Sequence, residues 1–301
     1  MSPTYKNGIA VAPHAAAAEA ANHILQEGGN AIEAMVAAAA TIAVVYPHMT
    51  AIGGDAFWVI HEPGKSPIAI DACGGAAKNA TIDYYKQQGV DAIPMRGPLA
   101  ANTVAGTISG WDAALQLSRT WRGKMPVSML VADAIKRARE GIIVTKSQFA
   151  STAAKLAELS PQPGFSDSFL VEGKAPDAGS RFALPRLANT LEYLAKAGLP
   201  DFYRGDISQS IAKDLASVGS PLTREDLAGH EARFCEPLRV VHSEGMLYNM
   251  SGFDAVRITR SDGKRLRLGS DDRATLLARL APRIRGGVLH DAGRPRPGPR
   301  R

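Results

Sequence analysis

Cys73, Gly74 and Arg96 have residue types that could take part in chemistry: a thiol, a backbone position without a side chain and a guanidinium group. Cys73 and Gly74 follow an apolar run and open a Cys-Gly-Gly turn that allows close approach to the backbone. Arg96 precedes Gly97-Pro98, and a guanidinium group binds a carboxylate through two hydrogen bonds. These residue types are compatible with contacts to a small acyl or carboxylate group. An ordinary surface position is the alternative for Arg96.

Other reactive side chains are weaker candidates for a catalytic or metal-binding role. Cys73 with His48 or His61 would form a thiolate pair, but the sequence supplies no third group to orient the histidine. Ser210 and Lys213 fit the Ser-x-x-Lys motif, but both lie in a predicted helix, where this spacing is ordinary and needs no catalytic role. The two cysteines of the chain have no CxxC and no metal-ligand spacing, so neither a metal nor a cofactor is expected.

A long apolar helix is expected to lie at the centre of the fold. From Ala31 to Tyr46 only Glu33 and Thr41 are not apolar, and a helix without a polar face belongs in a core. Asn30 is a suitable N-cap, with Glu33 at the capping-box spacing. Pro47 ends the helix.

Local patterns predict the remaining elements. A Gly-Gly pair precedes a strand that should be buried, and a second strand follows a Pro-Gly-Lys turn. Strands are expected at residues 8–12, 57–60, 67–72 and 102–105, and as a hairpin at 237–242 and 246–249. Helices are expected at residues 14–27, 82–88, 110–120, 127–140, 149–159, 184–197 and 207–218, with a surface loop at 161–180.

The run GGNAIEAMVAAAATIAVVYPHMTAIGGDAFWVIHEPGKSPIAIDACGGAA, residues 28–77, closely resembles the N-terminal segment of the gamma-glutamyltranspeptidase family of N-terminal-nucleophile (Ntn) hydrolases. The resemblance covers about residues 8–250, most of the family's large subunit. It implies an α/β (α+β) fold, an Ntn-hydrolase αββα sandwich that is helix-rich and incomplete because only large-subunit elements are present. Shorter runs continue the resemblance in the family's order: VAGTISGW from Val104, ADAIKRAREG ending at Gly141, DFYRG from Asp201, SPLTREDLAGH from Ser220 and VVHSEGMLYNM from Val240.

The family's nucleophile is a threonine at the start of a small subunit, released when the precursor cleaves itself, and its own α-amine serves as the base. No Thr-Thr-His-type processing motif precedes Arg301. Thr223, Thr259 and Thr275 lie in other settings. We therefore assign no catalytic residue to this chain. We expect it to be truncated before the nucleophile, to require a small-subunit polypeptide and to be inactive alone.

The resemblance also separates two substrate classes. In true gamma-glutamyl transferases the strand after the Gly-Gly turn ends in an Arg-Glu-Thr-Ala-Pro-like sequence, whose arginine binds the α-carboxylate of the substrate. Here Cys73 stands at that position. The resemblance therefore implies that Cys73 and Gly74 bind a different acyl group, with Arg96 as a replacement ligand for a carboxylate. The chain looks more like the oxamate amidohydrolase branch, so we expect an amidohydrolase of oxamate or another small acyl amide. The alternatives are a gamma-glutamyl transferase or hydrolase of glutathione-like substrates, and a non-enzymatic truncated protein that binds a partner.

The positive charge of the chain is concentrated at its C-terminal end. Residues 251–301 hold twelve arginines and one lysine against five acidic residues, a balance of +8. The other 250 residues hold 22 basic and 24 acidic residues, a balance of −2. We therefore predict a family-like region at residues 1–250 and an Arg/Gly/Pro-rich tail at 251–301, non-homologous or disordered apart from a helix at 271–284. Electrostatic binding of nucleic acid by this tail is the less favoured interpretation.

No window of the sequence is apolar and long enough to span a membrane, and the N-terminus has no charged-then-apolar signal pattern. We therefore expect no membrane partner and a cytoplasmic location.

Overall fold

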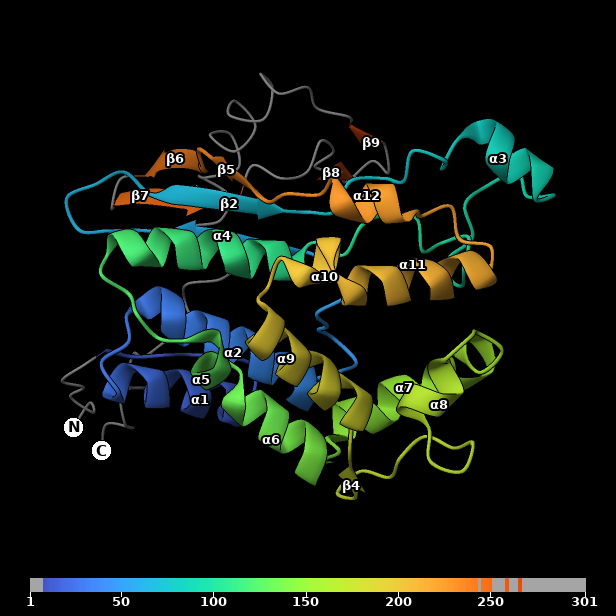
Figure 1. The fold of residues 1–301 in the computed structure, drawn as a ribbon, viewed down its shortest axis with the longest axis horizontal. Helices are drawn as coiled ribbons and strands as arrows, with labels where there is room; N and C mark the ends of the chain where they lie inside the picture. Colours follow the sequence, from blue (N-terminus) through green and yellow to red (C-terminus); the bar gives the residue numbers. More distant parts are fainter. Residues whose placement is uncertain (1–7, 243–244, 251–257, 260–264, 267–301) are drawn as a thin grey trace, which may run out of the picture. The chain divides into compact units, whose positions relative to one another are not determined.

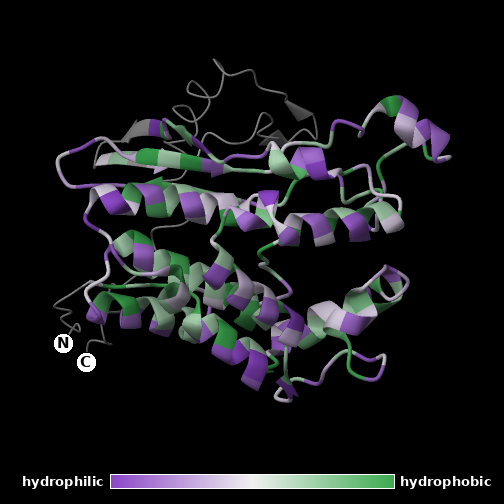
Figure 2. Cartoon of the chain, in the orientation of Figure 1, coloured by the Kyte–Doolittle hydropathy of each residue, from purple (hydrophilic) through white to green (hydrophobic). Residues whose placement is uncertain are grey.

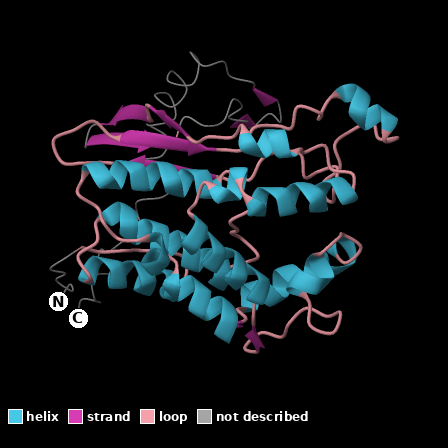
Figure 3. Cartoon of the chain, in the orientation of Figure 1, coloured by secondary structure: helices cyan, strands magenta, loops and turns pink. Residues whose placement is uncertain are grey.

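A computed structural model describes residues 8–242, 245–250, 258–259 and 265–266 of the 301-residue chain. The chain forms two compact units. The first holds Met1–Ala56 and Ala72–Arg233, and the second holds Phe57–Asp71 and Phe234–Arg301. Helices dominate the first unit, and most strands belong to the second (Figure 1, Figure 3).

The first unit contains twelve helices among its described residues, together with the short antiparallel strands β3 (Ile142–Ile143) and β4 (Arg181–Phe182). The helices are α1 (Ala15–Gln26), α2 (Ala31–Val45), α3 (Ile82–Gln87), α4 (Thr107–Thr120), α5 (Val127–Leu130), α6 (Ala132–Glu140), α7 (Lys146–Leu159), α8 (Phe165–Phe169), α9 (Pro185–Ala197), α10 (Asp201–Arg204), α11 (Asp206–Ser217) and α12 (Arg224–Ala228).

Helix α2 is the core helix of this unit, as its composition predicts. It contacts α1, α4, α5 and α6, and Val36 and Val44 are fully buried. Full burial of a valine side chain contributes roughly 1.5–3 kcal/mol. At its N-terminus, the Asn30 side chain accepts from the backbone N–H of Glu33 (3.1 Å), and the Glu33 carboxylate accepts from the Asn30 N–H (2.8 Å). The capping box expected from the sequence is therefore confirmed.

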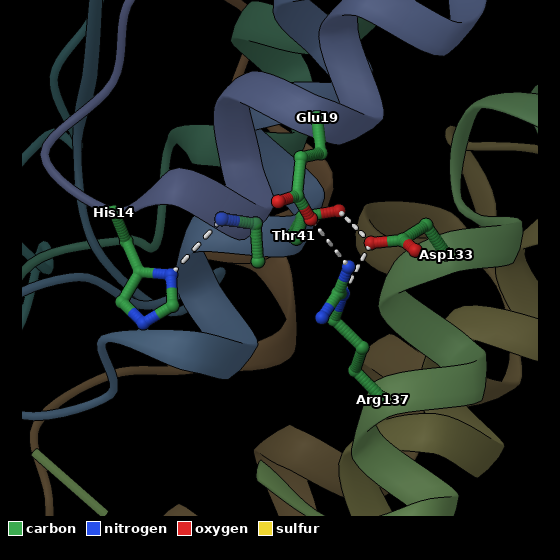
Figure 4. A network of polar contacts seen from close by, with 6 residues as sticks. His14, Glu19, Thr41, Asp133 and Arg137 are labelled. Atoms are coloured by element: carbon green, nitrogen blue, oxygen red, sulfur yellow. Dashed lines mark hydrogen bonds and ion pairs between the residues drawn. The ribbon is translucent and has the colours of Figure 1, made fainter. Parts of the chain in front are cut away.

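Polar contacts tie α1, α2 and α6 together (Figure 4). The buried Thr41 hydroxyl of α2 donates to the Asp133 carboxylate of α6 at 3.2 Å. Arg137, one turn further along α6, donates to the same Asp133 oxygen (2.7 Å) and to Glu19 of α1 (3.2 Å). The one polar residue in the middle of α2 is thus paired, which removes the cost of burying an unsatisfied hydroxyl.

The other long helices of the first unit are amphipathic. Figure 2 shows both hydrophilic and hydrophobic residues along α6 and α11. Helix α9 contacts α6 and buries Leu191 and Leu194, while α4 contacts α2 and buries Trp111. Apolar residues at three- and four-residue spacing therefore place α4, α6 and α9 in the core in the way that their sequences predict.

The second unit is built from strands. β1 (Ala56–Ile60), β2 (Ile68–Ala72) and β5 (Arg233–Cys235) form one sheet in the order β1-β2-β5. β6 (Leu238–His242) and β7 (Gly245–Asn249) form the antiparallel hairpin predicted from the sequence. β8 (Ile258–Thr259) pairs with β9 (Arg265–Leu266), again antiparallel.

Several local predictions are wrong. Residues 8–12 form no strand, and Ile9 and Val11 are exposed. Residues 102–105 make a single bridge, from Thr103 to Ala76, instead of a strand. Strand β1 exists but is not buried throughout, because Phe57 and Val59 are exposed. In each case the local residue pattern alone suggested a strand or its burial, while the neighbours that decide both lie elsewhere in the chain.

Helix boundaries also differ from the predictions. The predicted helix at residues 127–140 is divided at Val131 into α5 and α6, and α4 begins at Thr107, three residues earlier than predicted. The predicted loop at residues 161–180 contains α8. The helix predicted at residues 271–284, and most of the predicted tail, lie outside the described residues.

Candidate functional site

Three loop segments of the first unit meet around a cluster of glycines, which we call the glycine junction: residues 51–55, 72–77 and 104–107. The carbonyl of Gly54 accepts from the N–H of Gly106 (2.8 Å), the N–H of Thr107 (2.9 Å) and the Thr107 hydroxyl (2.8 Å). The N–H of Val104 donates to the Gly75 carbonyl at 3.0 Å. The start of α4 is thereby fixed against both of the other segments.

Asp55 holds Cys73 and Gly74 in the junction. One carboxylate oxygen accepts from the N–H of Gly74 at 2.9 Å, and the other accepts from the Cys73 thiol at 3.5 Å. The same carboxylate therefore fixes both the Cys73 side chain and the Gly74 backbone. The contact gives Cys73 a positioning role and does not favour the thiolate pair.

The two glycines after Cys73 have different surroundings. A Cβ atom on Gly74 would lie 1.5 Å from the Val104 carbonyl oxygen, so this position requires glycine. A Cβ atom on Gly75 would meet nothing within 4 Å, and Gly75 is exposed. A third glycine, Gly106, packs against the Ala72 carbonyl oxygen, 1.9 Å from where its Cβ would be. Packing fixes the Cys73–Gly74 backbone, and open space begins at Gly75.

Tyr203 supports the third segment of the junction. Its hydroxyl donates to the Ala105 carbonyl (2.8 Å) and accepts from the N–H of Ser109 in α4 (2.9 Å). The ring is buried, and this burial raises the pKa of Tyr203 far above its usual range. The phenol therefore remains neutral, and its two hydrogen bonds connect Ala105 to Ser109 at the start of α4.

Asp226 supports the far end of the Cys73 segment. It lies in α12, where it forms a capping box with Thr223, and its carboxylate also accepts from the N–H of Lys78 at 3.1 Å. Burial by itself raises the pKa of Asp226, but the hydrogen bonds from Lys78 and Thr223 outweigh it, so the pKa is lowered overall. The residue therefore stays ionised and connects α12 to the segment that carries Cys73.

Arg96 lies in a different place. Its Nε forms an ion pair with Glu158 of α7 at 3.1 Å. It lines a pocket of about 250 Å³ whose lining includes neither Cys73 nor Gly74. The full lining is Pro47, His48, Arg96, Gln148, Ser151, Thr152, Lys155, Leu159, Phe165 and Phe169. The structure thus joins Cys73 and Gly74 through Asp55 and gives Arg96 its own pocket.

The remaining candidates have other contacts. His48 Nε2 lies 3.1 Å from the Ser147 hydroxyl, and burial lowers the pKa of His48. Ser210 and Lys213 are exposed on α11. Within the described parts of the chain, no group of three or more histidine, cysteine or acidic residues could hold a metal ion.

None of the helices that the structure describes combines the length and the apolar character needed to cross a bilayer.

Sequence reasoning missed Asp55, the residue that positions the predicted pair. Its signal is its place directly after Gly53-Gly54, where a carboxylate can reach backbone groups of a neighbouring segment. Nothing in the local pattern indicates that this neighbour is Gly74, 19 residues away.

Comparisons with known proteins find similarity across most of the chain. The family profile described as gamma-glutamyltranspeptidase matches residues 17–258. The chain is 54% identical over 246 residues to the oxamate amidohydrolase proenzyme of Klebsiella pneumoniae, which covers 81% of this chain and 46% of that protein. It is 38% identical over 231 residues to the glutathione hydrolase-like YwrD proenzyme of Bacillus subtilis, and the match covers 76% of this chain and 43% of that protein. The chain spans about half the length of these curated relatives.

Solved structures show the same similarity. The gamma-glutamyltranspeptidase from Pseudomonas nitroreducens, complexed with L-DON, is 32% identical with a TM-score of 0.74, over 83% of this chain and 72% of that chain. The Helicobacter pylori gamma-glutamyltranspeptidase is 30% identical with a TM-score of 0.76, over 83% and 71%. The mixed helix-and-sheet fold class predicted from the sequence is confirmed.

Proposed function

Because the chain belongs to the gamma-glutamyltranspeptidase family, we propose that it forms the large-subunit part of an amidohydrolase that acts on a small amide such as oxamate. The observation that carries this proposal is the 54% identity to an oxamate amidohydrolase proenzyme, against 38% and 34% to glutathione hydrolase relatives. The proposal names the substrate class and a small-subunit partner.

The surroundings of Cys73 support a substrate other than a gamma-glutamyl compound. By the resemblance, gamma-glutamyl transferases use an arginine at this position to bind the substrate α-carboxylate. Here the corresponding thiol and the adjacent Gly74 N–H contact the Asp55 carboxylate. This position therefore lacks the guanidinium group that would bind the α-carboxylate of a gamma-glutamyl substrate, so this class is disfavoured.

In the proposed reaction, the threonine of the small subunit attacks the amide carbonyl, and its α-amine takes the hydroxyl proton. For oxamate the C–N bond breaks, the nitrogen leaves as ammonia, and an oxalyl ester remains on the threonine. Water then hydrolyses this ester to oxalate and regenerates the hydroxyl. Residues of this chain bind and orient substrate, and Cys73 and Gly74, held by Asp55, are the proposed contact points.

The test is reconstitution. The chain is co-expressed with the small-subunit segment of the Klebsiella relative, and ammonia release from oxamate is compared with p-nitroaniline release from gamma-glutamyl-p-nitroanilide. We expect oxamate hydrolysis, no activity when the leading threonine of the small subunit is replaced by alanine, and little gamma-glutamyl turnover. Preferential gamma-glutamyl turnover would instead support the glutathione-hydrolase alternative, whose basis is the lower identity of 34% to the Pseudomonas aeruginosa glutathione hydrolase proenzyme.

A further inference from the structure

The pocket beside Arg96 brings together charged and polar groups for which the proposed reaction has no role. Arg96 and His48 enter it from loops, Gln148 and Lys155 from α7, and Phe165 from α8. All of these residues belong to the first unit. At about 250 Å³ the pocket suits a small metabolite rather than a large cofactor.

The charges on the pocket wall do not cancel. Arg96 and Lys155 both bind Glu158, at 3.1 Å and 2.8 Å, which leaves one positive charge in excess. The hydrogen bond from Lys155 and the charges of Lys155 and Arg96 lower the pKa of Glu158, so this carboxylate stays ionised. A guanidinium has five N–H donors and an ammonium three, more than these contacts use. The wall therefore offers N–H donors to an anion.

Two buried polar atoms of the lining have no hydrogen-bond partner among the described residues. Gln148 is 3% exposed, yet its Oε1 is unpaired. The Nδ1 atom of His48 is also buried and unpaired. An unpaired buried acceptor costs free energy in the folded state, so a ligand N–H or O–H placed against Gln148 would be stabilising.

We propose that this pocket binds a small organic monoanion that carries a carboxylate beside an N–H or O–H donor. Arg96 and Lys155 bind the carboxylate, and the Gln148 carbonyl oxygen accepts from the donor. Inorganic phosphate or sulfate fits less well, since the net wall charge is a single positive one and the amide oxygen would face an anion oxygen. The apolar residues Pro47, Leu159 and Phe169 restrict the ligand to a small body.

Oxamate has this chemistry, and its choice as the probe rests on the proposed function. The experiment is isothermal titration of the full chain with oxamate, with acetate as the probe that lacks the donor and oxamide as the probe that lacks the carboxylate. We expect oxamate to bind saturably, and acetate and oxamide each to bind at least about tenfold more weakly than oxamate. Equal binding of acetate and oxamate would overturn the role of Gln148.

Matched variants locate the site. Arg96→Ala should weaken oxamate binding about tenfold to a hundredfold. Arg139→Ala is the control, because Arg139 is also paired with a glutamate, Glu192, and its side chain has the same 45% exposure. Gln148→Met should weaken binding while leaving the melting temperature unchanged or raised, since it removes a buried unpaired acceptor. If Gln148 had only a structural role, Gln148→Met would lower the melting temperature and leave oxamate binding unchanged.

The outcomes separate this inference from the proposed function. Absence of saturable oxamate binding, or equal binding by Arg96→Ala and the unmodified chain, overturns the site even if the reconstituted enzyme hydrolyses oxamate. Binding that depends on Arg96 and Gln148 supports the site even if reconstitution yields no hydrolysis.

Discussion

Gly74 shows how a single residue position controls the candidate site. Its N–H is bound by Asp55, and its Cα faces the Val104 carbonyl so closely that no side chain fits. The neighbouring Gly75 has the same residue type but open space around it. Glycine at position 74 thus allows close backbone packing, whereas the space around position 75 is open.

Gly74→Ala should therefore disrupt the junction, while Gly75→Ala should be tolerated. We expect Gly74→Ala to lower the free energy of unfolding by roughly 1–3 kcal/mol or more, because the backbone of residues 72–77 or of Val104 must move. Denaturant titration of both variants measures the difference. Equal stability of the two alanine variants would contradict the close approach of Gly74 to Val104.

At the scale of elements, the candidate site depends on helices that lie far from it in the sequence. Helix α4 starts on the Gly54 carbonyl, and α12 binds the N–H of Lys78 through Asp226. These caps act as links between elements as well as helix ends. The position of Cys73 is therefore sensitive to charge changes in α12.

The lowered pKa of Asp226 gives this link a pH dependence. A group whose pKa is depressed by folding adds stability above its unfolded pKa, about 3.9, and loses it as the pH falls through the folded value. Asp226→Asn should cost about 1–3 kcal/mol at pH 7, and the difference from the unmodified chain should shrink in acid. Chemical denaturation from pH 7 to pH 3 tests this. A constant difference across that range would exclude the ionised carboxylate as the cause, and Asp214→Asn, on the exposed face of α11, is the control.

At the scale of the whole molecule, the division of the chain is not sequential. The second unit is assembled from residues 57–71 and from the C-terminal part that begins at Phe234. The sequence-based boundary at residue 250 falls within this unit's second segment, Phe234–Arg301. Charge, by contrast, divides at residue 250: +8 on one side and −2 on the other.

Removing residues 251–301 should therefore convert a basic protein into a slightly acidic one, with a formal net charge of −2 in place of +6. We expect the full chain to be retained on a heparin column at pH 7 and the shortened chain to pass through, with retention of the full chain falling steeply as salt is added. Equal retention of both forms would place a polyanion-binding surface within residues 1–250.

The sequence alone determined those features that depend on neighbours a few residues apart. The capping box of Asn30 and Glu33, the apolar length of α2 and the β6–β7 hairpin could all be predicted, since caps, helical periods and tight turns act locally. The family resemblance was also accessible from the order of motifs. Local residue patterns also predicted strands at residues 8–12 and 102–105 that do not form.

Only the tertiary structure decided which segments meet. Asp55 with Gly74, Val104 against Gly74, and Arg96 with Glu158 are pairs from distant parts of the chain. A local pattern carries no signal for such pairs, because they follow from how helices and loops pack together and not from the period of either segment. For this reason the sequence identified the candidate residues, while the structure separated Cys73 and Gly74 from the pocket of Arg96.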